Sequence, residues 1–297
     1  GVLGREVAAG VEMRGAVEIL CRIACNGHTI TDSDLRPFGV GIYPLAALAN
    51  HACLPNCVQT FKGTAITIRA MREIPSGEEV TIAYVDVATP LVQRKADLKE
   101  RYLFECECGG CSGEEAEARE ASKVAWKSDH VSEELRDEAL KLAEEACISA
   151  EKMRGSADEV LERVLEACAK CEVVLDPLHV SLMRLREHAL RLSITIANWE
   201  EAERQCEATI APYRAHYPEG SPLVGLQLAT LGKIKAFLGR DLEARNNLSE
   251  AAPLLLRAFG QGDPCVKETE ERLREVMWSM DGLGEMAERT RAIQPPR

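Results

Sequence analysis

The stretch of sequence that decides the fold reads Cys106-Glu107-Cys108-Gly109-Gly110-Cys111, which places three thiols within six residues. Structural zinc is held tetrahedrally by four ligands at roughly 2.3 Å, so a fourth ligand must come from elsewhere. The segment Asn50-His51-Ala52-Cys53-Leu54-Pro55-Asn56-Cys57 offers Cys53, Cys57 and His51, and spacing alone does not choose among them. Three free thiols in a loop would be prone to oxidation, which disfavours a segment without metal. The sequence therefore predicts a structural Zn²⁺ site that joins two distant parts of the chain.

The composition fits an ordinary globular protein. The chain has 297 residues, 46% of them hydrophobic and 28% charged, which is enough for two domains with separate cores. No apolar run approaches the roughly 20 residues that cross a bilayer, and the start shows no secretory signal pattern. Twelve cysteines without such a signal point to a reducing compartment. We therefore expect a cytoplasmic or nuclear protein with no membrane partner.

The charge balance also limits the partners. The net charge is −12, and an acidic surface repels the phosphate backbone, so direct binding of nucleic acid is not expected. Solvated Glu-rich helices account for most of this charge. A protein partner with a basic tail fits it better.

The periodicity of the first part indicates short strands between helices. Residues 11–25 have apolar positions at helical spacing, and residues 91–103 are a second predicted helix. Between them, residues 57–61 and 64–69 form a predicted β-hairpin around Lys62-Gly63. Residues 80–84 are a predicted strand.

The second part, after Gly113, is predicted to be almost wholly helical. Residues 198–202 align with residues 240–244 at an offset of 42, and Ser221-Pro222 aligns with Asp263-Pro264 at the same offset. Asp176-Pro177 resembles these two boundaries, and Asp or Ser followed by Pro is typical of a helix start. A period near 42 predicts a tetratricopeptide-like array of helix pairs. An irregular helical bundle is the alternative.

Four motifs, taken in order, resemble a known family. They are Gly39-Val40-Gly41-Ile42-Tyr43-Pro44, the Asn50–Asn56 segment, Gly77-Glu78-Glu79-Val80-Thr81-Ile82-Ala83-Tyr84 and residues 102–111. Together they look like the SMYD family of SET-domain lysine methyltransferases, in which a MYND zinc finger interrupts the SET domain and a helical domain follows. The resemblance implies an α+β fold with residues 1–25 as a helical lead-in and 26–86 as the C-terminal half of the SET domain. Residues 87–113 would then be a post-SET zinc segment, and 114–290 a tetratricopeptide-like domain.

The resemblance also implies roles for individual residues. The zinc ligands would be Cys53, Cys106, Cys108 and Cys111. Residues implied to contact the cofactor, S-adenosylmethionine, are Asn26, Asn50, His51, Tyr84, Tyr102 and Phe104, with Tyr84 as the catalytic residue. Methyl transfer to an amine is an in-line displacement without an enzyme nucleophile, so alignment and electrostatics provide the catalysis. Aromatic walls suit the stem and the charge of a lysine.

Each of these residues also has a purely structural interpretation. Tyr84 ends an apolar strand and could be a core aromatic residue, and His51 could be a core histidine. Asn26-Gly27 is a common turn dipeptide, which makes Asn26 the weakest assignment. The order of the motifs favours the functional interpretation.

The family pattern is broken in two places. Ala52 stands where the family usually has Ser, which is a small change. Residues 1–25 resemble neither the Gly-rich early SET segment nor the MYND finger. We therefore expect the whole protein to be longer, and this chain alone to bind S-adenosylmethionine weakly or not at all.

The leading functional prediction is a protein-lysine N-methyltransferase acting on histone or other protein substrates. The alternative is a non-catalytic SET remnant in which the helical array binds a peptide or a chaperone tail. A zinc-stabilised structural subunit would explain the cysteines but not the presence of Tyr84, Asn50 and His51.

Overall fold

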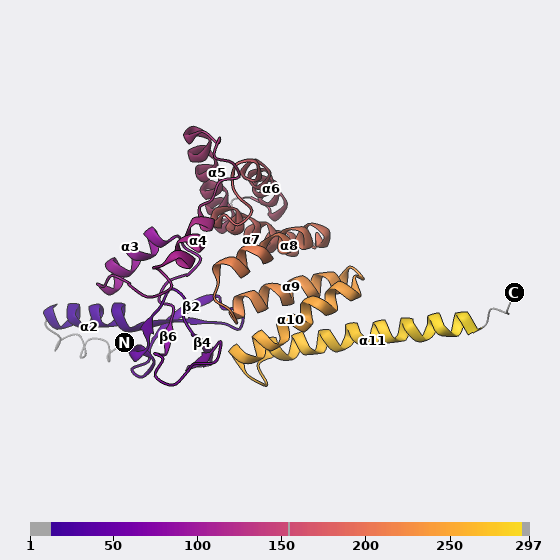
Figure 1. Cartoon of the computed structure of the whole chain (residues 1–297), viewed down its shortest axis with the longest axis horizontal. Coiled ribbons are helices and arrows are strands. Elements are labelled where there is room, and N and C mark those ends of the chain that lie inside the picture. The colour runs from indigo at the N-terminus through magenta and orange to yellow at the C-terminus, as the bar shows by residue number, and fades with distance from the viewer. Residues whose placement is uncertain (1–12, 154, 293–297) are drawn as a thin grey trace, which may run out of the picture.

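The computed structural model describes residues 13–153 and 155–292, with side chains as far as residue 280. Its strands gather in one part of the molecule and helices form the remainder, so the α+β prediction is confirmed (Figure 1). No helix in these ranges is both long and apolar enough to cross a membrane. The strands are β1 (Gly27–Thr31), β2 (Pro37–Ile42), β3 (Asn50–His51), β4 (Cys57–Lys62), β5 (Ala65–Ala70) and β6 (Thr81–Ile82), with the short 3-10 helix η1 (Ala46–Leu48) between β2 and β3. The helices are α2 (Met13–Asn26), α3 (Leu91–Tyr102), α4 (Glu114–Lys123), α5 (Glu133–Glu151), α6 (Ala157–Val174), α7 (Val180–Thr195), α8 (Trp199–His216), α9 (Pro222–Phe237), α10 (Asp241–Phe259) and α11 (Pro264–Ala292).

The predicted helices of the first part are present as α2 and α3. Residues 1–12 of the predicted lead-in lie outside the described residues. They include residues 11 and 12, with which the predicted first helix begins. Helix α3 ends at Tyr102 because Leu103 takes a left-handed conformation with φ of 61°. The predicted domain boundaries at residues 25, 86 and 113 stay predictions.

The predicted hairpin is present as β4 and β5, but its turn lies one residue later than predicted. Lys62 pairs with Ala65, so the two turn residues are Gly63 and Thr64. Gly63 has φ of 59°, and glycine takes this conformation at the first central position of a two-residue turn without the penalty of a Cβ. The position of the glycine therefore sets the register of the hairpin.

Strands β3 and β6 form a parallel pair in which Asn50 lies beside Thr81 and His51 beside Ile82. Strand β6 is shorter than the predicted strand 80–84. The ladder stops because the Tyr84 backbone N–H donates to the His51 side chain, 3.1 Å from Nδ1, instead of to a neighbouring strand. This side chain thereby takes the place of a strand partner and turns the chain at Tyr84.

Successive helices of the second part pack against one another, including α5 with α6, α7 with α8 and α9 with α10. The predicted helix start at Ser221-Pro222 is confirmed, because the Ser221 side chain accepts from the backbone N–H of Leu223. The prediction at Asp176-Pro177 is wrong. Asp176 instead forms a turn before the helix, and α7 starts after His179, whose Nδ1 accepts from the Ser181 N–H.

The helical part touches the sheets through α10, which packs against β4 and β5. The Arg257 side chain of α10 donates to the Met71 carbonyl at 2.5 Å. A Cβ added to Gly220 would lie 2.3 Å from the same oxygen, so the two parts approach closely there. An arginine side chain and a glycine thus meet the same carbonyl where the helical part approaches the sheets.

The buried cap of α7 predicts acid sensitivity. Burial lowers the pKa of His179 from 6.5 to about 4, and Nδ1 must stay unprotonated to accept from Ser181. The unfolded chain therefore binds a proton that the folded chain does not, and stability falls as the pH decreases from 6.5 towards 4. At about 1.4 kcal/mol per pKa unit, the loss approaches about 3 kcal/mol.

We expect His179→Asn, which keeps a capping oxygen, to reduce this pH dependence in urea unfolding measured at pH 7 and at about pH 4.5. His130→Asn, which replaces an exposed histidine, is the matched control. An unchanged difference between the two pH values in His179→Asn would contradict this explanation.

Candidate active site and zinc centre

Four cysteines from two separate segments converge beside α3. The Sγ atoms of Cys53, Cys106, Cys108 and Cys111, here termed the cysteine cluster, all lie within 4.8 Å of one another. Cys111 Sγ is 3.8 Å from Cys108 Sγ and 3.8 Å from Cys106 Sγ. A tetrahedron with metal–sulfur bonds of roughly 2.3 Å has edges of about 3.8 Å. The donor set and its dimensions therefore fit a tetrahedral zinc ion, and Cys57 and His51 are not members of the cluster.

Hydrogen bonds to Cys108 favour a thiolate at that one member of the cluster. The Cys53 N–H points at Cys108 Sγ at 3.1 Å. The pKa of Cys108 is lowered to about 3, first by the hydrogen bond from the Cys53 thiol and then by backbone N–H groups of Cys53 and Gly110. Thiolates are the form that binds zinc. A thiolate is thus supported at Cys108, whereas the hydrogen bond to Cys108 raises the pKa of Cys53 and burial raises the pKa of Cys111, so these two thiols would lose their protons on binding a metal.

Gly110 permits the close approach of the two segments. A Cβ at this position would lie 2.6 Å from the Leu54 nitrogen and 2.9 Å from the Cys53 carbonyl carbon. Both are backbone atoms, so a side chain at position 110 would force the two segments apart. Gly109, in contrast, has open space where a Cβ would be.

His51 lies between the cysteine cluster and Tyr84. Burial lowers the pKa of His51 to about 4, so its ring is neutral at physiological pH. Nδ1 accepts from the Tyr84 N–H, which assigns the ring proton to Nε2. Nε2 lies 3.5 Å from Cys53 Sγ and can donate to a thiolate there. The ring thus joins a predicted metal ligand to the backbone of the predicted catalytic residue.

The predicted aromatic residues surround Tyr84. The Tyr84 and Tyr102 rings have centroids 4.8 Å apart, and Phe104 meets Tyr84 edge-on at 6.4 Å. The left-handed residue Leu103 separates Tyr102 from Phe104, and both rings face the same neighbour. The Tyr84 hydroxyl donates to the Ala49 carbonyl at 2.7 Å. Its oxygen therefore keeps lone pairs for another donor.

A cavity opens beside this aromatic group. The predicted residues Asn26, Tyr84 and Tyr102 line it together with Gly27, His28 and Gln59. Among the described residues, Asn50, His51 and Phe104 do not line it. Asn50 is exposed and donates to Glu79 at 2.6 Å, and Asn26 donates to the Arg22 carbonyl at 2.9 Å. The structure thus brings three of the six predicted cofactor residues to one cavity.

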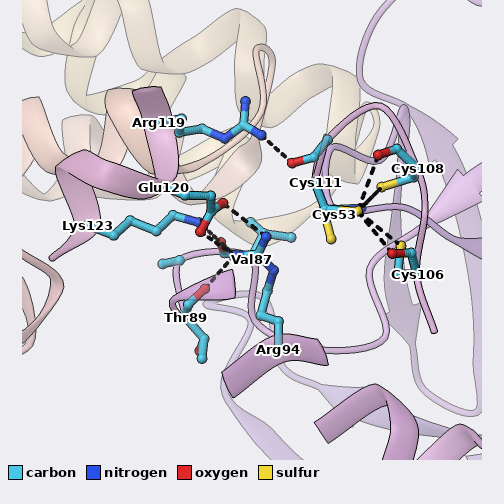
Figure 2. A network of polar contacts seen from close by, with 12 residues as sticks. Cys53, Val87, Thr89, Arg94, Cys106, Cys108, Cys111, Arg119, Glu120 and Lys123 are labelled. Carbon is cyan, nitrogen blue, oxygen red and sulfur yellow. Dashed lines mark hydrogen bonds and ion pairs between the residues drawn. The ribbon is translucent and has the colours of Figure 1, made fainter. Parts of the chain in front are cut away.

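The buried ion pair of Arg94 and Glu120 was not predicted from the sequence. Arg94 of α3 is fully buried and pairs with Glu120 of α4 (Figure 2). A signal was present, because Leu91, Arg94 and Leu98 are spaced as one face of a helix. A cation on an apolar face is an exception that indicates a buried partner.

Comparison with known proteins identifies related chains. A family model described as SET domain matches residues 22–85. The chain is 32% identical to the histone-lysine N-methyltransferase ASHR1 of Arabidopsis thaliana, over 90% of this chain and 62% of the relative. It is 30% identical to the N-lysine methyltransferase SMYD2 of Gallus gallus, over 87% and 60%, and 28% identical to the histone-lysine N-methyltransferase SMYD3 of Mus musculus, over 84% and 56%. The chain thus spans about three fifths of the length of these curated relatives.

Substitution of the two neighbouring glycines tests the zinc centre. We expect Gly110→Ala to push the loop away from Cys53, to destabilise the chain by about 1–3 kcal/mol and to lower its zinc content. Gly109→Ala is the matched control and should keep wild-type stability and zinc content. Thermal unfolding and elemental analysis of the purified variants measure both effects. Equal stability and equal zinc content of the two variants would contradict the close contact of Gly110 with the backbone of Cys53 and Leu54.

Proposed function

Because this chain belongs to the SMYD family of SET-domain proteins, we propose that it is part of a protein-lysine N-methyltransferase that uses S-adenosylmethionine. The names of the relatives, which describe lysine methyltransferases, support this reaction. The single structural observation that carries the proposal is the convergence of Tyr84, Tyr102 and Asn26 on one cavity. These residues come from three separate segments, and the fold places them together.

Tyr84 has the properties of a positioning hydroxyl. Burial raises its pKa, with smaller contributions from Tyr102 and Glu79, so the phenol is neutral at physiological pH. It donates to the Ala49 carbonyl, which fixes the direction of its lone pairs. S-adenosylmethionine, when bound, supplies a methyl group on a sulfonium. A neutral phenol can then orient the substrate amine by accepting its hydrogen bond.

The aromatic rings would select the substrate. Tyr102 and Phe104 present faces and edges next to Tyr84, and such surfaces suit the apolar stem of lysine and attract its cationic end. Asn26 carries an amide at the rim of the cavity, where it could bind the polar end of the cofactor. Asn50 and His51 lie outside the cavity lining, and His51 would act on the site only through its bond to the Tyr84 backbone.

Zinc would have a structural role here. With the cysteine cluster as its ligands, no position is left for water, which is typical of structural sites. Three of the four cysteines follow Tyr102 and Phe104 closely in the chain, so metal binding would hold both rings against Tyr84.

The whole protein would contribute a further segment to this half of the site. Strand β2 exposes three apolar side chains. Phe38 is 69% accessible, Val40 66% and Ile42 48%. Helix α2 has no buried residue although it carries apolar side chains. Exposed apolar patches of this kind are normally covered by another element. In this proposal, a further SET segment would cover them and complete the cofactor pocket.

The substrate would be a protein with a lysine in a basic segment. The net charge of −12 favours a basic partner over an acidic one. A location in the cytoplasm or the nucleus is part of this proposal, and a chain with twelve cysteines would be compatible with a reducing compartment. The array of helices α7–α11 could bind a peptide or a chaperone tail in addition, without replacing the catalytic role.

Removal of one hydroxyl tests the proposed chemistry. In the full-length protein, we expect Tyr84→Phe to lower the transfer of radiolabelled methyl groups to histones by at least about 100-fold, because the positioning oxygen is lost while the ring remains. Tyr43→Phe removes a hydroxyl from the same half of the chain, outside the cavity lining, and should have little effect. Methyl transfer that survives in Tyr84→Phe would exclude the assigned role.

Cofactor titration tests the completeness of the pocket. We expect the 297-residue chain to bind S-adenosylmethionine weakly or not at all in isothermal calorimetry. The full-length protein, with the apolar face of β2 covered, should bind it measurably. Micromolar affinity of the 297-residue chain would show that its own residues suffice.

A further inference from the structure

His28 lies in strand β1 and is buried at the candidate active-site cavity. It is 7% exposed, and it lines the cavity together with Tyr84 and Tyr102. The cavity has a volume of about 400 Å³, a size typical of small-molecule sites. A buried imidazole at such a cavity is either a structural residue or a group that accepts and donates protons. The hydrogen bonds of the ring decide between these two roles.

Two neighbours hold the His28 ring in one orientation. Its Nδ1 lies 2.8 Å from Oε1 of Gln59 in strand β4, and the Tyr43 ring meets it at 75° with centroids 5.9 Å apart. An amide oxygen can only accept a hydrogen bond, so Nδ1 is the nitrogen that carries the ring proton. The other nitrogen, Nε2, therefore has a free lone pair.

The Nε2 lone pair of His28 is available to a bound molecule. Among the described residues, the His28 side chain has a hydrogen-bond partner only at Nδ1. Nε2 is also not sealed inside the protein, because it is not among the unbonded side-chain atoms that are fully buried. For a buried residue that lines the cavity, the open side is the cavity itself.

The other titratable groups that line the cavity are poor proton acceptors. The Cys25 thiol donates its proton to the Arg101 carbonyl at 3.6 Å. Burial raises the pKa of Tyr84 and of Tyr102, so both phenols keep their protons. The remaining polar side chains of the lining are amides and a hydroxyl, which are not bases near neutral pH. His28 is thus the side chain of the lining that is best suited to take up a proton.

The proposed methyl transfer requires such a proton acceptor. A lysine amine has a pKa of about 10.4, so it enters the cavity as an ammonium ion without a lone pair. A neutral phenol can orient this group but cannot remove its proton. The amine therefore needs a second group, besides Tyr84, before it can attack a methyl group.

From this geometry we propose that His28 is a second catalytic residue, whose Nε2 takes the proton from the substrate ammonium before methyl transfer. The N–H bond of the ammonium breaks, its electron pair stays on nitrogen, and the proton joins Nε2. The nitrogen pair then forms the new N–C bond, and the pair of the broken C–S bond stays on sulfur. The imidazolium keeps its Nδ1–H bond to Gln59 and later releases the proton to solvent. This inference rests on the proposed methyl transfer and adds the base that the reaction needs.

Nitrogen-15 NMR of the histidine rings tests the tautomer in the 297-residue chain, without cofactor or substrate. We expect the proton of the His28 ring on Nδ1, with the signal assigned by its absence in His28→Asn. We expect Gln59→Leu, which removes the accepting oxygen, to shift this proton towards Nε2. A proton on Nε2 of the wild-type ring would overturn the proposal, even if no variant of His28 could be assayed.

Methyl transfer by the full-length protein tests the role of the base. General base catalysis contributes about 100-fold or more, so we expect His28→Phe, which keeps an aromatic ring, to lose at least about 100-fold at pH 7. His130→Phe replaces an exposed histidine far along the chain and should change the rate by less than about twofold. A folded His28→Phe with the wild-type rate would overturn the proposal.

The pH dependence of the same two rates distinguishes a base from a structural histidine. The neutral fraction of lysine rises about tenfold per pH unit below its pKa, so an acceptor matters less at high pH. The ratio of the wild-type rate to the His28→Phe rate should therefore fall at least about tenfold between pH 7 and pH 9. The other groups at the cavity titrate in both proteins and cancel in the ratio; they are Cys25, Tyr43, Tyr84 and Tyr102, with Glu79 and Arg101 as the charges that act on the last two.

The outcomes separate this inference from the proposed function. A constant ratio across this pH range would overturn the role of His28 as a base and leave the methyl transfer intact. A wild-type full-length protein that transfers no methyl group would instead overturn the proposed function, together with this inference.

Discussion

The closure of one small tetrahedron by cysteines from two segments is the constraint on which the candidate site depends. Cys53 follows strand β3, whereas the other three ligands follow helix α3. Their union brings the end of α3 to the segment after β3, and with it Tyr102 and Phe104 to Tyr84. The glycine at position 110 is required because the two backbones almost touch. The contact between the loop at Gly110 and the segment at Cys53 therefore forms both the cysteine cluster and the aromatic group around Tyr84.

Much of this arrangement could be predicted from the sequence. The three cysteines in six residues indicated a metal, and the resemblance to the SMYD family, not the spacing, implied Cys53 and not Cys57 as the fourth member. The hairpin of β4 and β5 was indicated by strand-forming residues on either side of a glycine. These features are encoded by neighbouring residues or by motifs with fixed spacing, which is why sequence reasoning reached them. The assignments of Tyr84 and of the cofactor residues stay predictions.

Other features depend on partners that are distant in the chain. Strand β6 is short because a histidine from β3 occupies the next backbone donor, and no local pattern encodes that bond. Helix α7 starts after His179 because Asp176 is used in a turn. The family resemblance implied six cofactor residues, but only three of them line one cavity. The direction of a side chain is set by the fold and cannot be predicted from the motif. The spacing of Arg94 between Leu91 and Leu98 indicated a buried partner, but only the fold identifies that partner as Glu120 of α4.

The separation of the four clustered cysteines along the chain has a consequence for folding. Cys53 and Cys108 are 55 residues apart, so the cluster closes a long loop, and the entropy of that closure must be overcome before the metal can compensate for it. The helices of the second part contact mainly their neighbours in sequence, and such contacts form quickly. We therefore expect the helices of the second part to be ordered first and the first part to reach its final geometry later, at a rate that would rise with zinc concentration under the proposed metal binding.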